Sequence, residues 1–194
     1  MPDDELILPD DFTESTSASD PTIDPDVAEP IVCPFSIIVD SREQAPFHFT
    51  GIDVDKSAGS FFGQSLIVST IVDTLATGDY SILGFSDKVA VERKSVSDWF
   101  HSIGTDRERF EREAERLAKM DYAAVVIEGD WNELLLNSAK YTRMNPLVTS
   151  RTIISWSVKY NIHFWPCMSR RHAELVTFQS LKQFWRHQKE NGKG

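Results

Sequence analysis

The chain has 194 residues, and 41% of them are hydrophobic, which is enough to bury one sizeable core and favours a single domain. Two cysteines exclude a disulfide framework and a zinc site, and an acidic amino terminus without any long apolar run excludes a secretory signal and a membrane span. The formal net charge of −10, taken alone, argues against a nucleic-acid partner. A cytoplasmic location is expected, nucleoid-associated in a prokaryote, with a nuclear one left open.

The acidic residues are concentrated at the amino terminus. Residues 1–34 contain ten acidic residues and no lysine or arginine, whereas residues 35–194 contain twenty acidic and twenty basic residues. The first segment cannot bury enough apolar surface to offset its ordering entropy, which predicts a disordered acidic tail before a folded domain at 35–194. The tail would keep the protein in solution, mimic DNA in a basic groove, or recruit a partner. Because the folded part is neutral overall, it can still present a local basic face to DNA.

The first predicted strand covers residues 35–40 and ends in a polar turn. Asp40 and Arg42 share a face just past the strand end, and Glu43 follows them. In isolation this acid–arginine–acid group would indicate only a salt-bridged turn. The aromatic, glycine-punctuated stretch 45–64 then predicts a loop with some packed rings.

A strand over residues 66–75 is predicted next, followed by a hairpin. Its two strands cover 80–83 and 89–94, the second of which alternates apolar and polar residues, and the turn covers 84–87. Such a hairpin brings the start of one strand beside the end of the other.

Asp79 would then lie beside Glu92 and Lys94, which share one face of their strand, with Arg93 on the opposite face. Two carboxylates and an ammonium on adjacent strand ends are typical of a divalent-metal site with a lysine that handles protons. The pattern therefore indicates hydrolysis of phosphodiesters.

Two helices are predicted after the hairpin. Ser95 to Asp98 has the pattern of a capping box and begins a helix that runs to about residue 103, so the Asp98 carboxylate either caps that helix or belongs to the catalytic site. A second box begins a helix over residues 105–120 with an apolar stripe. Its arginines form a separate file that is either a solvated, salt-bridged face or a phosphate contact.

The remaining pattern alternates strands and helices. Predicted strands cover residues 122–128 and 162–165, and predicted helices cover 131–137, 145–160 and 170–190.

These motifs, taken together, resemble the signature of the XPF-type structure-specific endonucleases. That signature reads GD…ERKxxxD, and here it is carried by Gly78-Asp79, Glu92-Arg93-Lys94 and Asp98. The resemblance extends to Asp40-Ser-Arg-Glu43 upstream and to the arginine-rich helix downstream. It implies an α/β fold of the restriction-endonuclease-like PD-(D/E)XK class, with a central mixed β-sheet flanked by helices. The sequence departs from many members of that family, because it has no room for a helix–hairpin–helix module after the domain and no helicase-like region before it, so a stand-alone version of the domain is expected.

The resemblance further implies which residues bind the metal, which catalyse the reaction and which contact DNA. Mg²⁺ or Mn²⁺ would be held by Asp79, Glu92 and Asp40, with a main-chain carbonyl near Arg93 as a further ligand. The candidate catalytic residues are Asp40, Arg42, Glu43, Asp79, Glu92, Arg93, Lys94 and Asp98. The candidate DNA-binding residues are Arg107, Arg109 and Arg112.

The function predicted from the sequence is a metal-dependent endonuclease acting on branched, nicked or otherwise structured DNA in repair or recombination. A homodimer or a partner protein bound through the nuclease domain is expected by resemblance, and no membrane. One alternative is a catalytically silent DNA-binding or scaffolding module of the same fold. Another is a structural protein in which Glu92 and Lys94 are merely ion-paired.

Overall fold

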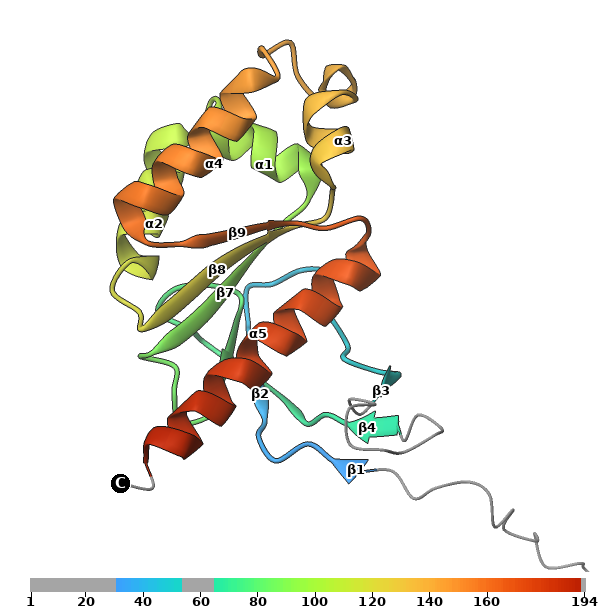
Figure 1. Ribbon diagram of the computed structural model, residues 1–194, viewed down its shortest axis with the longest axis vertical. Helices are drawn as coiled ribbons and strands as arrows, with labels where there is room; N and C mark the ends of the chain where they lie inside the picture. The colour runs from blue at the N-terminus through green and yellow to red at the C-terminus, as the bar shows by residue number, and fades with distance from the viewer. Residues whose placement is uncertain (1–30, 54–64, 193–194) are drawn as a thin grey trace, which may run out of the picture.

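The computed structural model describes residues 31–53 and 65–192, and its centre is a six-stranded mixed sheet (Figure 1). In spatial order its strands are β5 (Thr70–Asp73), β2 (Ile37–Asp40), β6 (Tyr80–Ile82), β7 (Val89–Lys94), β8 (Tyr122–Ile127) and β9 (His163–Pro166). The pairs β2–β6 and β6–β7 are antiparallel, and the other neighbours are parallel. A smaller sheet joins β1 (Ile31–Val32), β4 (Ser65–Ile67) and β3 (Ile52–Asp53).

Helices cover both faces of the main sheet (Figure 1). They are α1 (Val96–Ile103), α2 (Arg107–Leu117), α3 (Trp131–Leu135), α4 (Leu147–Tyr160) and α5 (Arg170–Asn191), with a 3-10 turn at Ser138–Lys140. The predicted central mixed sheet flanked by helices is confirmed. Within the part of the chain that the structure describes, no helix is both long and apolar enough to cross a bilayer.

The sheet divides the core into two layers because successive strand residues point to opposite faces. Val89 and Val91 of β7 pack in the layer that α5 covers, together with Phe178. Ala90, between them, packs in the layer of α1, α2 and α4, beside Trp99. Because central strands are buried on both faces, they appear in the sequence as nearly continuous apolar runs.

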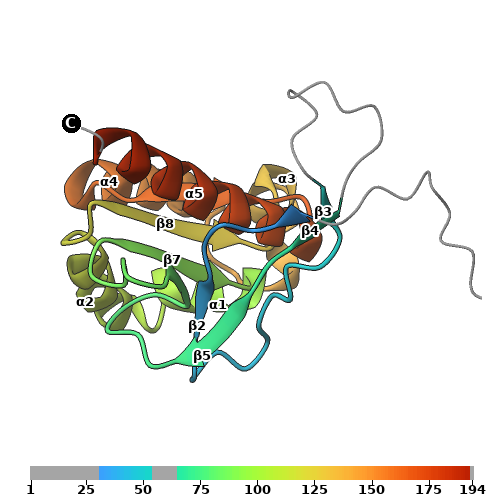
Figure 2. The same cartoon turned by 90° about the horizontal axis from the view of Figure 1, so that it is seen from below.

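One predicted strand is divided into two. The structure breaks the predicted strand 66–75 into β4 and β5, which belong to different sheets (Figure 2). Ile31 pairs with Leu66 and Ile37 with Thr70, so the register slips by two residues between the two pairings. The β-branched run has no glycine or proline at the break, and so the sequence gives no local signal of it.

The folded part also begins earlier than the composition indicates. Residues 31–33 were assigned to the tail, but β1 pairs with β4, and Cys33 is buried in the core beneath α5. Three residues with apolar side chains at the end of a strongly acidic segment are too few to change its average composition. The rest of the predicted tail, residues 1–30, and residues 54–64 of the predicted loop lie outside the described residues.

Candidate functional site

The hairpin of β6 and β7 places Asp79 beside the end of β7, as its sequence pattern predicts. Tyr80 pairs with Val91, and the Asp79 amide donates to the Val91 carbonyl (2.9 Å). The Asp79 Oδ2 accepts from the main-chain N–H of Arg93 (2.7 Å), while the Asp79 carbonyl accepts from the Asp40 N–H (2.8 Å). Main chain therefore fixes the Asp79 backbone and carboxylate on both sides.

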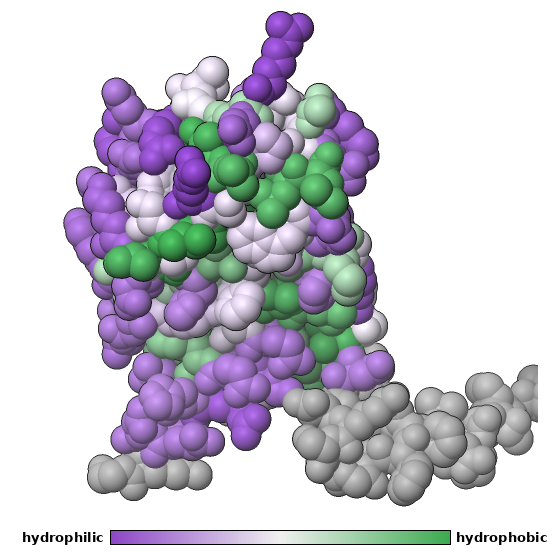
Figure 3. Space-filling model, turned by 45° about the horizontal axis from the view of Figure 1, so that its top comes forward, coloured by the Kyte–Doolittle hydropathy of each residue, from purple (hydrophilic) through white to green (hydrophobic). Residues whose placement is uncertain are grey.

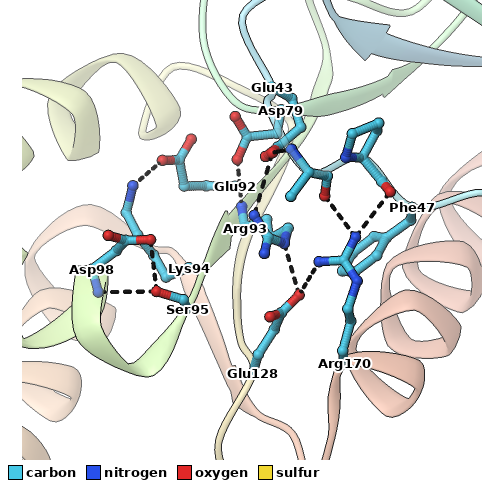
Figure 4. Close-up of polar contacts among 12 residues, drawn as sticks. Glu43, Phe47, Asp79, Glu92, Arg93, Lys94, Ser95, Asp98, Glu128 and Arg170 are labelled. Carbon is cyan, nitrogen blue, oxygen red and sulfur yellow. Dashed lines mark hydrogen bonds and ion pairs between the residues drawn. The ribbon is translucent and has the colours of Figure 1, made fainter. Parts of the chain in front are cut away.

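Glu92 and Lys94 lie on the same face of β7, and the Lys94 Nζ donates to the Glu92 Oε1 (Figure 4). Glu92 is 7% exposed. The ammonium also lies 5.3 Å from the centre of the Phe110 ring, on the α2 side of the sheet. The two side chains thus form a desolvated ion pair next to Asp79.

Burial governs the protonation of this group. Burial and, second to it, the neighbouring Glu92 carboxylate together raise the pKa of Asp79 to about 8, although the hydrogen bond from the Arg93 N–H opposes them. Burial also raises the pKa of Glu92, although Lys94 opposes this. For Lys94, burial lowers the pKa, but the charge and hydrogen bond of Glu92 raise it by more, so the ammonium stays protonated.

The donor set fits a hard divalent cation. Half-buried Asp79 and buried Glu92 bring two carboxylates to one cavity, and carboxylate oxygens suit Mg²⁺ and Mn²⁺. In residues 31–53 and 65–192, no group of three or more His, Cys, Asp and Glu side chains is placed to hold a metal ion. Mg²⁺ is commonly held by one or two carboxylates together with water and phosphate, which is what Asp79 and Glu92 would provide.

The third predicted metal ligand, Asp40, has a different environment. Its Oδ1 accepts from the Arg42 main-chain N–H (2.8 Å) and Nε (2.8 Å), and its Oδ2 accepts from the Arg42 Nη2 (2.9 Å) and the Leu75 N–H (2.7 Å). The Arg42 guanidinium lowers the pKa of Asp40 to about 2. Four bonds use the four acceptor positions of a carboxylate, so Asp40 fixes Arg42 and does not offer a free oxygen to a metal.

Arg93 and Asp98 complete the predicted motif in different ways. Arg93 lies on the opposite face of β7 and contacts Glu43 and Glu128 (Figure 4). At the start of α1 the cap is Ser95, whose Oγ accepts from the Asp98 N–H (3.1 Å) and donates to the Asp98 Oδ2 (2.7 Å). The Asp98 carboxylate therefore binds the capping hydroxyl, and Asp98 also lines the cavity beside Lys94.

The carboxylates open into a polar cavity of about 610 Å³, and a second one of about 360 Å³ shares its wall. Arg42, Arg109 and Arg116 line both, forming an arginine rim around the acidic floor. Of the three predicted DNA-binding arginines, only Arg109 is among the residues that line these cavities. Arg107 packs on the Trp156 ring (4.9 Å) and pairs with Glu111, whereas Arg112 is exposed elsewhere on α2.

Sequence reasoning missed one acidic residue that lines the cavity, Glu113. Glu113 accepts from the Thr77 hydroxyl and the Gly78 N–H (3.4 Å), and it contacts Arg116. The sequence could have indicated Glu113, because it lies four residues after Arg109 and three before Arg116 and so shares a helix face with both.

We predict that Gly78→Ala lowers both stability and metal binding. Gly78 has φ +75°, and a Cβ there would lie 3.0 Å from the Ala90 Cβ and 3.3 Å from the Val91 carbonyl. The strained backbone should cost about 1–3 kcal/mol and displace Asp79. Thermal unfolding with and without Mn²⁺ measures both effects. Gly84→Ala is the matched control, because it has a similar φ of +84° with open space around it; equal losses in the two variants would exclude a special role for the contact at Gly78.

Comparison with known proteins completes the description of the site. Residues 39–178 match the family model described as the ERCC4 domain. The structure is similar to XPF from Aeropyrum pernix at 22% identity and a TM-score of 0.54, over 76% of this chain and 60% of that one. It is also similar to XPF from Aeropyrum pernix in complex with DNA, at 22% identity and a TM-score of 0.56, over 78% of this chain and 66% of that one.

These likenesses confirm the restriction-endonuclease-like fold predicted from the sequence. This chain spans about three fifths to two thirds of the length of those solved chains. Among curated proteins, the sequence finds no match.

Proposed function

Because the chain belongs to the ERCC4 domain family, we propose that it is a divalent-metal-dependent endonuclease that hydrolyses phosphodiester bonds in branched, nicked or otherwise structured DNA during repair or recombination. The observation that carries the proposal is that Asp79 and the Glu92–Lys94 ion pair line one cavity with an arginine rim. An acidic floor suits a metal, and an arginine rim suits phosphate.

Asp79 and Glu92 would hold Mg²⁺ or Mn²⁺. Bound there, the cation would polarise the scissile phosphate and lower the pKa of a coordinated water. Lys94 keeps its proton because Glu92 stabilises the ammonium, and so it can donate a hydrogen bond to the charge that develops on the phosphate oxygens. Asp40 holds Arg42 at the rim, where its side chain is 67% exposed and able to meet a phosphate.

The cleavage test uses a panel of fork, flap, nicked and plain duplex DNA with Mg²⁺, with Mn²⁺ or with a chelator. Cleavage of branched or nicked substrates that needs the metal supports the proposal. Binding of the same substrates without turnover at any metal concentration would instead establish the silent DNA-binding module. The presence of Asp79, Glu92 and Lys94 in one cavity favours the enzyme.

We predict that the arginine rim contributes to DNA affinity through phosphate contacts. Arg109→Gln and Arg116→Gln should each weaken binding of a branched DNA and reduce the slope of log affinity against log salt by about 1. Arg112→Gln is the matched control, because it removes an arginine of the same helix that lies outside the cavities. Binding is measured by fluorescence anisotropy over a salt series with a chelator present. Equal slopes for all three variants would place the DNA elsewhere.

We also propose that the domain pairs with a second copy or a partner protein through its late helices. Ile154 and Val158 of α4 are 63% and 82% exposed, and Trp165 of β9 is 44% exposed. Figure 3 shows several groups of apolar side chains exposed among polar ones on the face that it presents. Contiguous exposed apolar patches mark interaction sites. Light scattering of the wild type and of an Ile154→Asp, Val158→Asp variant tests pairing with a second copy, which is excluded if the wild type is monomeric.

A further inference from the structure

Four side chains of alternating charge connect through Arg93 on the α5 side of β7. Arg93 Nη1 contacts the Glu43 Oε1 (3.3 Å), and Arg93 Nε donates to the Glu128 Oε1 (2.7 Å). The same Glu128 oxygen accepts from Arg170 Nη1 (2.7 Å) (Figure 4). Glu43, Arg93, Glu128 and Arg170 are together called the charge chain below.

The far end of the charge chain holds the loop on which Glu43 lies. Arg170 Nη2 donates to the main-chain oxygens of Ala45 (2.7 Å) and Pro46 (2.9 Å). The guanidinium of Arg170 lies 5.0 Å from the centre of the Phe47 ring, and that of Arg93 lies 5.8 Å from it. The start of α5 thus fixes a loop that is more than 120 residues away in sequence.

Three members of the charge chain are largely shielded from solvent. The side chains of Glu43, Arg93 and Glu128 are 7%, 12% and 13% exposed, and that of Arg170 is 43% exposed. Buried charges cost free energy unless they are paired and hydrogen-bonded, and removal of one partner leaves the next uncompensated. The positions of these four groups are therefore interdependent.

The near end of the charge chain reaches the metal-binding cavity. Glu43 lines that cavity together with Asp79 and Glu92, and its charge contributes to the raised pKa of both carboxyls. Glu128 and Arg170 do not line it. They contact the cavity only through Arg93 and through the loop at Ala45 and Pro46.

We propose that Glu128 and Arg170 are positioning residues that hold Glu43 at the edge of the metal-binding cavity. This inference rests on the nuclease function proposed above. With Glu128 present, Arg93 divides its hydrogen bonds between two carboxylates. Without that carboxylate, Arg93 has Glu43 as its single anionic partner and draws it toward the α5 side, which removes a negative charge from the cavity edge.

The matched comparison is Arg170→Gln against Arg171→Gln. Both arginines lie in the first turn of α5, and both pair with a glutamate and donate to a loop carbonyl. Arg171 contacts Glu174 and Gly51 and is not part of the charge chain. Calorimetric titration with Mn²⁺ in the absence of DNA should show about tenfold weaker binding for Arg170→Gln and for Glu128→Gln, with Arg171→Gln unchanged.

Single-turnover cleavage gives the second measurement. Glu128→Gln should lower the maximal rate about 10- to 100-fold with an unchanged half-saturating DNA concentration. The loss should disappear in a Glu43→Gln background, because Glu128 acts through Glu43. A purely structural role would instead give the same loss in both backgrounds.

The outcomes separate the two proposals. If the wild type binds Mn²⁺ but cleaves none of the DNA panel, the nuclease proposal fails, and the Mn²⁺ titration still tests the charge chain. If the wild type cleaves DNA but Arg170→Gln and Arg171→Gln bind Mn²⁺ equally well, the positioning inference is wrong. Additive losses for Glu43→Gln and Glu128→Gln would also overturn it.

Discussion

Asp79→Asn is expected to abolish cleavage while stabilising the metal-free protein at pH 8. The substitution removes a metal ligand, and metal-ion catalysis contributes several kcal/mol, so the rate should fall at least about 1,000-fold. The amide oxygen can still accept from the Arg93 N–H, which preserves the local structure. Asp87→Asn, an exposed change in the turn of the same hairpin, is the control and should leave the rate unchanged.

The gain in stability follows from the raised pKa of Asp79. Its value of about 8 in the folded state lies above the ordinary 3.8, so between these values the folded protein holds a proton that the unfolded chain releases. The free energy of unfolding therefore falls as pH rises from about 4 to 8, by up to about 1.4 kcal/mol per pH unit. Above pH 8 this contribution is fully lost.

Thermal melting at pH 5 and pH 8 measures this effect. In a chelator, the wild type should lose stability between the two values more steeply than Asp79→Asn. Mn²⁺ should restore the wild type at pH 8 and have little effect on the variant. An Asp79→Asn protein that retains wild-type cleavage, or that is stabilised by Mn²⁺ as much as the wild type, would disprove the metal assignment.

Lys94→Met should reduce turnover about 100- to 1,000-fold while Mn²⁺ affinity stays near normal. The methionine keeps an apolar side chain against Phe110 but removes the hydrogen bond to developing charge. Lys88→Met, an exposed change just before β7, is the control.

The same variant separates two roles for the lysine. If Lys94 serves mainly as a counter-ion to Glu92, its loss leaves the cavity more negative, Mn²⁺ binds more tightly, and high metal restores the rate. Titration of Mn²⁺ against the single-turnover rate distinguishes the roles. Full rescue by metal would exclude Lys94 as a catalytic residue.

The hairpin could be predicted from the sequence because its information is local. A strand that alternates faces, a short turn and a second strand specify that Asp79 meets Glu92 and Lys94, and the structure shows that arrangement. The same alternation places Arg93 on the other face. The placement of the Arg93 side chain on the α5 side, away from Glu92 and Lys94, therefore follows from the period of a strand.

The remaining contacts depend on how distant elements pack. Glu113 reaches Gly78 from α2, and Arg170 reaches Ala45 from α5. In the sequence these side chains look like ordinary members of salt-bridged helices. The four hydrogen bonds that occupy the Asp40 carboxylate could not be predicted from the sequence either, because one of them comes from Leu75, which is 35 residues away.

The alternation in β7 also limits how this gene segment can evolve. Consecutive side chains of the strand Val89–Lys94 point to opposite faces of the sheet: Glu92 and Lys94 face α2, and Arg93 faces Phe47. A one-residue insertion or deletion within the strand would move the side chains that follow it to the opposite face of the sheet. Arg93 would then face the side of the acidic cavity, and its neighbours Glu92 and Lys94 would face Phe47. A substitution in this strand changes one side chain of the site, whereas an insertion or deletion moves several of them to the opposite face at once.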